Sequence, residues 1–564
     1  MGERIFIGVA WPYADGPLHL GHIAGVYLPS DIFARYHRTK GDEVLMVSGS
    51  DQHGTPITIK AEQEGKKPEE IVNQYHQQFL DSWQKLGISF DLFTRTGTAN
   101  HAEVSHNFFL TLLNKGYIYK ATGSQPFCPH CQRFLSDRYI EGICPYCHFS
   151  GARGDQCDGC GKPITPAELI DPGCKLCGTT PQFKDSEHFF FRLSAFQDKL
   201  LTWMKGKTHW RPNVLNFTMR YVEEGLRNRA ITRDIEWGVT VPLDGFEGKR
   251  LYVWFEAVIG YLSATKEWAK SSGDEGRWRS FWQDDEAKSY YFIGKDNIIF
   301  HTVIWPAMLM GYDNLNLPYD VPANEFLTIE GRKLSTSRHW AVWLPDYLSR
   351  YDPDPLRYLL SISMPETGDT DFSWREFVRR NNDELVATYG NLVHRVLTFV
   401  YRSFDGCVPV PGEFDYHSEG IIDDAKAIFD TMGSLICKCH FKQAIMSAML
   451  LAQETNRYLE IESPWKTNKQ YRPATATASA ATTLYVAISV ISCLRTVLYP
   501  FLPFSSQKLH QYLGFEGSVE DDGWQPRFPS PGQKLLPPEP LFSKLDEGLI
   551  EEEVSRVGHV EHNL

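Results

Sequence analysis

Four Cys-x-x-Cys pairs lie between residues 128 and 177 of this 564-residue chain. They are Cys128/Cys131, Cys144/Cys147, Cys157/Cys160 and Cys174/Cys177. Because a closed tetrahedral zinc site takes four thiolates from two such pairs, the spacing predicts one or two structural Zn²⁺ ions. A site closed by four cysteines leaves no position for a water molecule, so a catalytic role for the metal is not expected.

Disulfides are the alternative for these cysteines. The N-terminus, MGERIFIGVAWPYADG, lacks the apolar core and cleavage site of a secretory signal. A cytoplasmic location is therefore expected, and there thiols stay reduced and metal binding is favoured. The other cysteines lack the pair spacing and are expected to pack as small hydrophobic side chains: Cys407, Cys437, Cys439 and Cys493.

The assignment of the pairs to metal ions stays open. The shortest gap between pairs is the one between the second and third, residues 148–156. A nested arrangement puts these inner pairs on one zinc and the outer pairs on another, whereas sequential pairing joins neighbours. The first zinc of the nested arrangement has the ligands Cys144, Cys147, Cys157 and Cys160. The second has the ligands Cys128, Cys131, Cys174 and Cys177.

The chain on both sides of the cysteine-rich segment alternates between strand and helix patterns. Residues 5–10 and 44–47 are short apolar runs typical of buried strands. Residues 68–86 place apolar side chains on one helical face, with proline at the start and glycine after the end. Strand patterns return at residues 251–255 and 290–293. The alternation predicts an α/β fold with a parallel sheet, interrupted by an insertion that bound metal ions stabilise.

Helical periodicity dominates from about residue 374 onward. Within it, residues 474–494 carry no charge and are numerous enough to span a bilayer. Seven of these residues are Ser or Thr, which favours a buried helix in a helical domain. No membrane contact is therefore expected.

The formal charge is −13, from 57 basic and 70 acidic residues. This balance argues against a protein that coats nucleic acid non-specifically, because such proteins are basic. The excess is uneven: residues 515–564 hold eleven acidic and four basic side chains, whereas residues 205–234 hold seven basic and three acidic ones. A specific RNA partner, held by local patches and base contacts, remains compatible with the total.

Two separate motifs are suited to bind phosphate. His19-Leu20-Gly21-His22 follows the first predicted strand at the start of a helix, where free backbone amides attract anions. Residues 331–338, GRKLSTSR, combine a leading glycine with basic and hydroxyl side chains. Taken alone, either motif could be an ordinary surface segment.

Together, the two motifs resemble the signatures of class I aminoacyl-tRNA synthetases. Further segments make the chain similar to the methionyl-tRNA synthetase family over roughly residues 4–510: AWPYADG, SDQHGTP, YVWFEAVIGY, FIGKDNIIFH, GNLVHR and NRYLEIESPW. The resemblance implies a Rossmann-like parallel-sheet catalytic domain with a zinc-knuckle insertion, followed by an all-α anticodon-binding domain. The implied bounds are 1–118 and 215–325 for the catalytic halves, 119–214 for the insertion, 326–375 for the signature-loop region and 376–564 for the helical domain with its acidic tail.

The family activates L-methionine with ATP and Mg²⁺ and joins it to the 3′ adenosine of tRNA(Met). The resemblance implies that His19, His22 and Lys333 are catalytic. The implied ATP-binding residues are His19, Gly21, His22, Gly294, Asp296, Lys333 and Thr336. Thr336 stands where the family usually has a second lysine, so Arg332 or Arg338 could share the neutralisation of phosphate charge.

The resemblance also implies a methionine pocket, with Asp51 for the α-ammonium group and apolar walls for the thioether. Its residues are Tyr13, Asp51, Trp254, Ala257, Tyr261 and His301. The implied anticodon readers are Asn391, Arg395 and Trp465, and the tryptophan would stack on a base. Three departures from the commonest family residues could reshape the pocket wall: Trp11, Val258 and Asn297.

Two alternatives remain open. A class I synthetase for leucine, isoleucine or valine would carry a much larger insertion with an editing domain. A non-catalytic, zinc-bearing RNA-binding paralogue would be expected to have lost the histidine motif or the loop lysine. A monomer is expected, because the sequence is too short for the C-terminal dimerisation domain that many relatives append.

Overall fold

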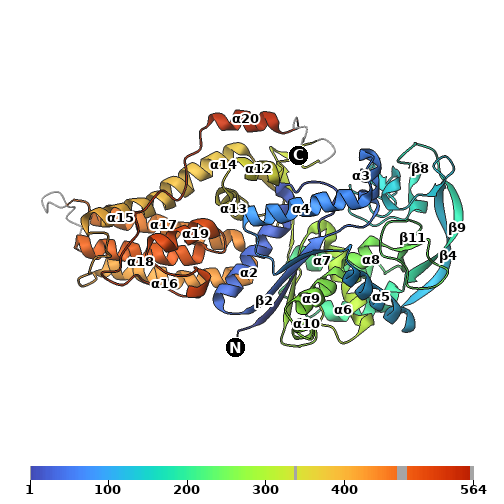
Figure 1. Cartoon of the computed structure of the whole chain (residues 1–564), viewed down its shortest axis with the longest axis horizontal. Helices are drawn as coiled ribbons and strands as arrows, with labels where there is room; N and C mark the ends of the chain where they lie inside the picture. Colours follow the sequence, from blue (N-terminus) through green and yellow to red (C-terminus); the bar gives the residue numbers. More distant parts are fainter. Residues whose placement is uncertain (1, 336–338, 467–478, 559–564) are drawn as a thin grey trace.

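The structure is a computed structural model that describes residues 2–335, 339–466 and 479–558. Figure 1 shows an α/β part and a helical part that follow one another along the long axis of the molecule. A β-rich segment lies at the end of the α/β part that is farthest from the helices. The predicted fold class, a parallel-sheet domain with an insertion followed by a helical domain, is confirmed.

A five-stranded parallel sheet forms the core of the α/β part, in the order β14-β13-β1-β2-β3. Its strands are β1 (Arg4–Val9), β2 (Glu43–Ser50), β3 (Leu92–Arg95), β13 (Lys288–Gly294) and β14 (Ala323–Asn324). Ile7 of β1 lies opposite Met46 on one side and Tyr290 on the other. Because β1 is central, the segments after β1, β2 and β13 meet at one edge of the sheet, the usual place for a ligand in such folds.

One local prediction for the α/β part is wrong, and the others are confirmed. Strands β1, β2 and β13 fall on the predicted apolar runs, and helix α4 (Pro68–Leu86) begins and ends as predicted. The strand predicted at residues 251–255 is only β12 (Arg250–Leu251), and helix α8 (Val253–Ala257) follows it. A short and mostly buried apolar run has no periodicity that separates a strand from a helix.

The insertion is a long antiparallel hairpin of β4 (Ile118–Cys128) and β9 (Gln182–Phe191). Short strands fold over its tip, where β6 (Ile140–Ile143) pairs with β8 (Ile170–Cys174). The buried side chains here form a separate small core: Leu135, Tyr139, Ile140, Ala152, Ile164, Leu169 and four of the cysteines. So small a core needs a further constraint, which a bound metal provides in domains of this kind.

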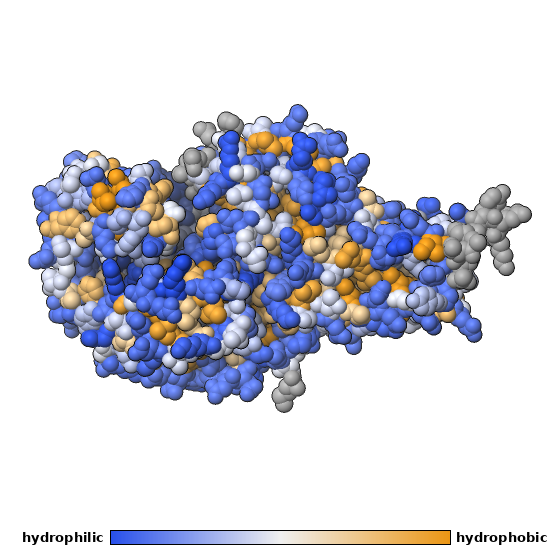
Figure 2. Space-filling view, turned by 180° about the vertical axis from the view of Figure 1, so that it is seen from behind, coloured by the Kyte–Doolittle hydropathy of each residue, from blue (hydrophilic) through white to orange (hydrophobic). Residues whose placement is uncertain are grey.

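The helical part is a bundle whose central helix is α18 (Ala480–Leu498). Among the described residues, α18 is the one helix long and apolar enough to cross a membrane, and 89% of its 18-residue window is buried inside the protein. The prediction of a buried helix is therefore confirmed for the described portion of residues 474–494. Seen from behind, the surface is mostly hydrophilic with scattered apolar patches (Figure 2).

The acidic C-terminal segment packs back onto the protein. Trp524 donates a hydrogen bond from Nε1 to the carbonyl of Phe429 at 3.0 Å. Helix α20 (Gly548–Arg556) lies beside α14 (Trp374–Arg380) (Figure 1), and its Glu553 carboxylate accepts a hydrogen bond from the Tyr351 hydroxyl at 2.7 Å. This segment therefore covers part of the protein surface with net negative charge.

The cysteines outside the insertion follow the prediction only in part. Cys439 and Cys493 are buried, as expected for small hydrophobic side chains. Cys437 is exposed and Cys407 is partly exposed, so the prediction is wrong for these two. Cys437 is the last residue of helix α16 (Tyr416–Cys437), where its face meets solvent.

A fully buried arginine joins the two parts. Arg357 of α13 (Pro353–Ile362) pairs with Asp31 of α2 (Leu28–Lys40) at 2.7 Å, and neither side chain is exposed. Three backbone carbonyls also accept hydrogen bonds from this guanidinium: those of Leu86, Pro500 and Phe501. Burial alone would raise the pKa of Asp31, but the charges of Arg35 and Arg357 outweigh burial and lower this pKa to about 2. The junction is therefore held by charges that water does not reach.

Candidate active site and metal clusters

The two motifs that the sequence predicts to bind phosphate meet beyond the end of β1. The rings of His19 and His22 stack with their centroids 3.7 Å apart, and the backbone N–H of His19 donates to Nδ1 of His22 at 3.1 Å. Gly21 lies between them at the start of the helix. A Cβ atom at Gly21 would lie 2.5 Å from a terminal methyl group of Leu334 in the second motif, so the glycine leaves the space that this side chain occupies.

The two imidazoles of this motif are neutral at physiological pH. Burial lowers the pKa of both, that of His22 to about 4. Nδ1 of His19 is buried and has no partner within the described part of the chain. A neutral imidazole with a free ring nitrogen can hydrogen-bond to a phosphate oxygen, but it cannot neutralise the phosphate charge.

The second motif supplies one accessible lysine. Strand β16 (Arg332–Lys333) pairs with β15 (Leu327–Ile329) at the edge of a small sheet, and both residues of β16 are exposed. The Arg332 guanidinium lies over the Trp340 ring at 4.7 Å, whereas Lys333 lies over no aromatic ring of the described residues. Thr336 and Arg338 lie outside the described residues.

A carboxylate follows the end of β13. Asp296 lies in a short turn after Gly294, and a Cβ atom on that glycine would come 2.7 Å from Oδ1 of the carboxylate. Burial raises the pKa of Asp296. Lys295 is engaged elsewhere, with Glu325 at 2.8 Å and Asp369 at 2.7 Å. The glycine thus leaves room for a carboxylate that faces the same edge of the sheet as the histidines.

The side chains of the predicted methionine pocket come from segments far apart in the sequence and contact one another in pairs. Nε1 of Trp254 donates to the Tyr13 hydroxyl at 2.6 Å. The Tyr261 hydroxyl and Nε2 of His301 are 2.7 Å apart. Helix α8 carries both Trp254 and Ala257, and both are partly exposed.

Asp51 completes this group at the end of β2. Its backbone N–H donates to the carbonyl of Pro12 at 2.8 Å, which ties it to the segment that carries Tyr13. Its side chain is buried, and the residue is 4% exposed. Burial raises the pKa of Asp51 well above its usual range, and the negative charge of Glu256 raises it further. A carboxylate in this setting gains from a cationic ligand.

Of the three residues that depart from the common family pattern, Trp11 packs into the wall of the predicted methionine pocket, and Asn297 contributes only a backbone group. A Cβ atom at Gly49 would collide with the Trp11 ring, and one at Gly260 would lie 2.9 Å from it, so small residues make room for this indole. The Trp11 ring meets Tyr261 edge-on, with centroids 6.5 Å apart. Asn297 takes part through its backbone carbonyl, which lies 3.0 Å from Nδ1 of His301.

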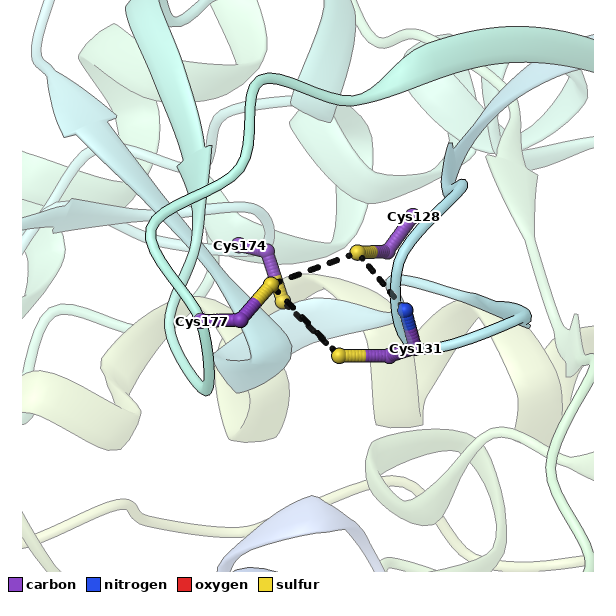
Figure 3. A group of neighbouring side chains, drawn as sticks. All are labelled: Cys128, Cys131, Cys174 and Cys177. Carbon is purple, nitrogen blue, oxygen red and sulfur yellow. Dashed lines mark hydrogen bonds between the residues drawn. The ribbon is translucent and has the colours of Figure 1, made fainter.

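The eight cysteines of the insertion form two tetrads, and the pairing is the nested one. The first tetrad is Cys144, Cys147, Cys157 and Cys160, and the second is Cys128, Cys131, Cys174 and Cys177. Figure 3 shows the four side chains of the second tetrad pointing toward one another from two turns of the chain. Neighbouring sulfurs are 3.5 to 3.9 Å apart in the second tetrad, and 3.6 and 3.9 Å apart in the first. A tetrahedron with Zn–S bonds of about 2.3 Å has edges of about 3.8 Å, so both donor sets fit zinc.

The predicted anticodon readers lie in the helical part. Asn391 and Arg395 stand one turn apart on α15 (Asn391–Ser403), and Asn391 is exposed. The Arg395 guanidinium lies over the Trp465 ring at 4.5 Å and donates to Oδ1 of Asn456 at 3.2 Å. Trp465 follows helix α17 (Phe441–Glu462) and is partly exposed, so it can present one ring face to a ligand.

Comparison with known proteins accounts for both parts of the chain. A family model described as tRNA synthetases class I (M) matches residues 5–397, more than half of the sequence. The chain belongs to the methionyl-tRNA synthetase family. A second model, described as the anticodon binding domain of methionyl tRNA ligase, matches residues 408–561. Membership in the methionyl-tRNA synthetase family sets aside the alternative of a class I synthetase for leucine, isoleucine or valine.

Relatives within the methionyl-tRNA synthetase family match along the whole chain. A methionine–tRNA ligase of Dehalococcoides mccartyi is 62% identical over 558 residues, which cover 99% of this chain and 100% of the relative. One from Thermomicrobium roseum is 52% identical over 584 residues, which cover 99% of each. The fold is similar to that of Mycobacterium tuberculosis methionyl-tRNA synthetase bound by methionyl-adenylate, with a TM-score of 0.79, 26% identity, and coverage of 96% of this chain and 100% of that one.

Sequence reasoning missed a buried cluster of charged side chains next to the predicted methionine pocket. The Glu256 carboxylate, fully buried on α8, lies 2.8 Å from Nδ1 of His53 and also contacts Nε2 of His101. Burial would raise the pKa of Glu256, but the two histidines outweigh it and lower this pKa to about 2. The backbone N–H of His53 donates to Oδ1 of Asp51 at 3.2 Å, so the cluster joins α8 to the Asp51 segment. The three residues are too far apart in sequence for any local pattern to reveal the cluster.

Proposed function

We propose that this chain is a methionine–tRNA ligase. It activates L-methionine with ATP to methionyl-adenylate and then transfers methionine to the 3′ adenosine of initiator and elongator tRNA(Met). The observation that carries the proposal is the meeting of Asp51, an aromatic pocket and the His19/His22 turn at one edge of the sheet. The names and high identity of the relatives support it.

The amino-acid site has the chemistry that methionine needs. The buried Asp51 carboxylate binds the α-ammonium group, and the ion pair lowers the pKa of Asp51 that burial had raised. The rings of Tyr13, Trp254 and Tyr261 surround the side chain, and each sulfur–aromatic contact is favourable by about 0.3–1.5 kcal/mol. His301, bonded to the Tyr261 hydroxyl, closes the pocket.

The nucleotide lies on the other side of β1. His19 and His22 hydrogen-bond to phosphate oxygens, Gly21 lets the adenine approach the backbone, and Asp296 accepts from the ribose hydroxyls. The methionine carboxylate oxygen bonds to the α-phosphorus as the bond to the β-phosphate breaks, and pyrophosphate leaves with its Mg²⁺. Lys333 neutralises the departing pyrophosphate. Catalysis consists mainly of positioning and of electrostatic stabilisation of charge on the α-phosphate.

Exchange of labelled pyrophosphate into ATP tests the first step. We expect exchange to depend on methionine and to stay near background with leucine, isoleucine, valine or cysteine. Charging of initiator and elongator tRNA(Met) transcripts tests the second step. A protein that binds tRNA(Met) but supports neither reaction would be the non-catalytic paralogue, an interpretation disfavoured by the presence of His19, His22 and Lys333.

The proposed organisation follows the sequence motifs. We place the catalytic domain at residues 1–118 and 215–325, the insertion at 119–214, the signature-loop region at 326–375 and the anticodon-binding domain at 376–564. We propose that the protein acts as a cytoplasmic monomer. Light scattering that gives a dimer mass would contradict the monomer.

In the anticodon-binding domain, we propose that Trp465 stacks on a base while Asn391 and Arg395 bond to base edges. Replacing Trp465 with alanine is expected to reduce kcat/KM for tRNA by about 5- to 150-fold, because stacking on an aromatic side chain is worth about 1–3 kcal/mol per base. Methionine-dependent exchange should stay at the wild-type rate. The measurement is tRNA charging compared with exchange on the same preparation.

The matched control for Trp465 is Tyr416→Ala, which removes an aromatic ring that is 85% exposed in the same domain. Charging by this control should be unchanged. An equal loss of exchange and charging in Trp465→Ala would contradict an anticodon role.

We further propose that each cysteine tetrad holds one structural zinc ion. Metal analysis should find two zinc ions per chain, one for each tetrad. Cys144→Ser is expected to remove one of them, because a tetrad that loses a thiolate no longer closes the site. Cys437→Ser, which changes an exposed cysteine outside the tetrads, should retain both. Full zinc content in Cys144→Ser, or one zinc in the wild type, would contradict the two-ion assignment.

A further inference from the structure

The insertion places one arginine against the proposed methionine pocket. Arg138 lies in a short turn, η2 (Asp137–Tyr139), between Cys131 of the second tetrad and Cys144 of the first. Its guanidinium lies over the Tyr13 ring, with Cζ 5.6 Å from the ring centroid. That distance falls within the range of a cation–π contact. An insertion residue therefore reaches the wall of the amino-acid site.

The Arg138 guanidinium lacks an acceptor. Within the described residues, the side chain makes no hydrogen bond and no ion pair, and it is only partly exposed. Its interactions with carboxylates are at longer range, and they are strongest with Asp155 and Asp15. The N–H groups of this guanidinium are therefore open to an acceptor that a ligand supplies, and a charge-assisted hydrogen bond of that kind is stronger than one between neutral groups.

The backbone around Arg138 is fixed on both sides. Its N–H donates to the Thr55 hydroxyl at 3.4 Å, and the Tyr139 hydroxyl donates to Thr58 at 2.8 Å, both on helix α3 (Thr55–Glu64). The carbonyl of Tyr139 accepts a hydrogen bond at 2.9 Å from the backbone of Lys175, inside the last cysteine knuckle. The second tetrad and α3 thus hold the turn in place, and the guanidinium is preorganised over the site.

Arg138 is also close to the nucleotide side of the site. Burial raises the pKa of Asp15 and of Asp296, and the positive charge of Arg138 opposes the shift in both. The guanidinium therefore lies within electrostatic reach of both Tyr13 and the proposed ribose carboxylate. In the proposed complex, the reacting phosphate lies between the methionine at Tyr13 and the ribose at Asp296.

The proposed site is short of cations for a phosphate. His19 and His22 are neutral at physiological pH, Lys295 is paired with two carboxylates, and Arg332 stacks on a tryptophan. Among the described cations of the signature loop and of the turn over Tyr13, Lys333 and Arg138 form no ion pair with described residues. A guanidinium binds phosphate through a planar pair of N–H donors, which makes Arg138 the stronger of the two candidates for a bidentate contact.

We propose that Arg138 binds a phosphate group at the mouth of the active site, so that the zinc-stapled insertion contributes directly to substrate binding. The inference rests on the proposed function and deepens it. The phosphate belongs either to ATP or to the 3′-terminal phosphodiester of tRNA. Both present the same chemistry, and they act in different steps of the reaction.

The test separates the two sources of phosphate. Arg138→Gln should lower either kcat/KM for ATP in pyrophosphate exchange or the single-turnover rate of transfer from preformed methionyl-adenylate to tRNA, by about 10- to 100-fold. Loss in exchange identifies the ATP phosphate, and loss confined to transfer identifies the tRNA phosphodiester. In either case KM for methionine should change by less than about threefold.

Two further variants keep the test decisive. Arg138→Lys retains the charge and should recover part of the lost rate. Arg153→Gln changes a nearby insertion arginine that is paired with Asp158 at 3.0 Å, and it should match the wild type. Zinc content and thermal stability are measured on every variant.

The proposal is overturned if Arg138→Gln, with normal zinc content, runs both steps within about twofold of the wild type. It is also overturned if Arg153→Gln reproduces the loss, because that would indicate a general effect of the insertion. Failure of the proposed function would look different, since the wild-type protein itself would then lack methionine-dependent exchange.

Discussion

Replacing Asp51 with alanine is expected to lower kcat/KM for methionine in pyrophosphate exchange by roughly 100- to 5,000-fold, because removing one partner of a buried ion pair costs about 3–5 kcal/mol. In the proposed complex, Asp51 is the partner of the α-ammonium group, and its residue is 4% exposed. Without the carboxylate, the ammonium group would enter a buried site with no counter-charge. The measurement is exchange over a range of methionine concentrations.

The stability of the variant distinguishes this effect from misfolding. Burial and Glu256 raise the pKa of Asp51 in the free protein, so its ionised form destabilises the fold as pH rises above the unfolded-state value near 4. Asp51→Asn should therefore unfold at the wild-type temperature or above it at neutral pH, yet lose exchange as Asp51→Ala does. Exchange retained within about tenfold in both variants would remove Asp51 from the ammonium site.

The raised pKa of Asp51 also predicts how kcat/KM for methionine depends on pH. Methionine binding requires the ionised carboxylate, so kcat/KM for methionine should fall as the pH is lowered through the raised pKa of Asp51. The loss should begin at a higher pH than an ordinary aspartate would give. A profile that stays flat down to the usual range of a carboxyl group would contradict the buried, Glu256-coupled setting.

Replacing Arg357 with methionine is expected to destabilise the protein by about 3–5 kcal/mol, the usual cost of leaving one charge of a buried pair without its partner. Asp31 would lose one of its two arginine partners, and the carbonyls of Pro500 and Phe501 would lose their donor. Urea unfolding measures the loss. Because the pair lies at the junction, we also expect the unfolding transition to broaden or split as the two parts uncouple.

Two controls accompany Arg357→Met. Arg379→Met removes an exposed arginine that pairs with Glu376 at 2.8 Å, and it should change stability by less than about 1 kcal/mol. Arg357→Lys keeps a positive charge beside Asp31 and should lose less stability than Arg357→Met. Equal, small losses for Arg357→Met and Arg379→Met would show that the buried pair contributes little.

The parts of the structure that the sequence predicted well depend on neighbours in the chain. The helix at residues 68–86 is bounded by a proline and by Gly87, which has a φ of 74°, so both of its ends are local signals. The short gap at residues 148–156 suggested the nested pairing of the cysteines, but sequential pairing stayed open until the structure showed the two tetrads. Both motifs that meet at Gly21 could be found, although only the structure shows that Leu334 touches it.

The parts that the sequence could not predict depend on distant residues. Trp254 lies in a helix rather than in the predicted strand, because the buried run around it is compatible with either pattern. Glu256 pairs with histidines 155 and 203 positions away, and Arg357 with an aspartate 326 positions away. Such pairs become visible only when the backbone has been placed. Arg138 is a similar case, since nothing in its local sequence indicates that it reaches Tyr13.

The nested tetrads impose an order on the folding of the insertion. Cys147 and Cys157 are ten residues apart, whereas Cys131 and Cys174 are 43 apart. Closing the longer loop costs about 1.3 kcal/mol more in chain entropy, so the inner tetrad closes first and shortens the loop left for the outer one. Synthesis on the ribosome reinforces this order. The four cysteines of the inner tetrad are all available once Cys160 has emerged. The outer tetrad is incomplete until Cys177 has been synthesised.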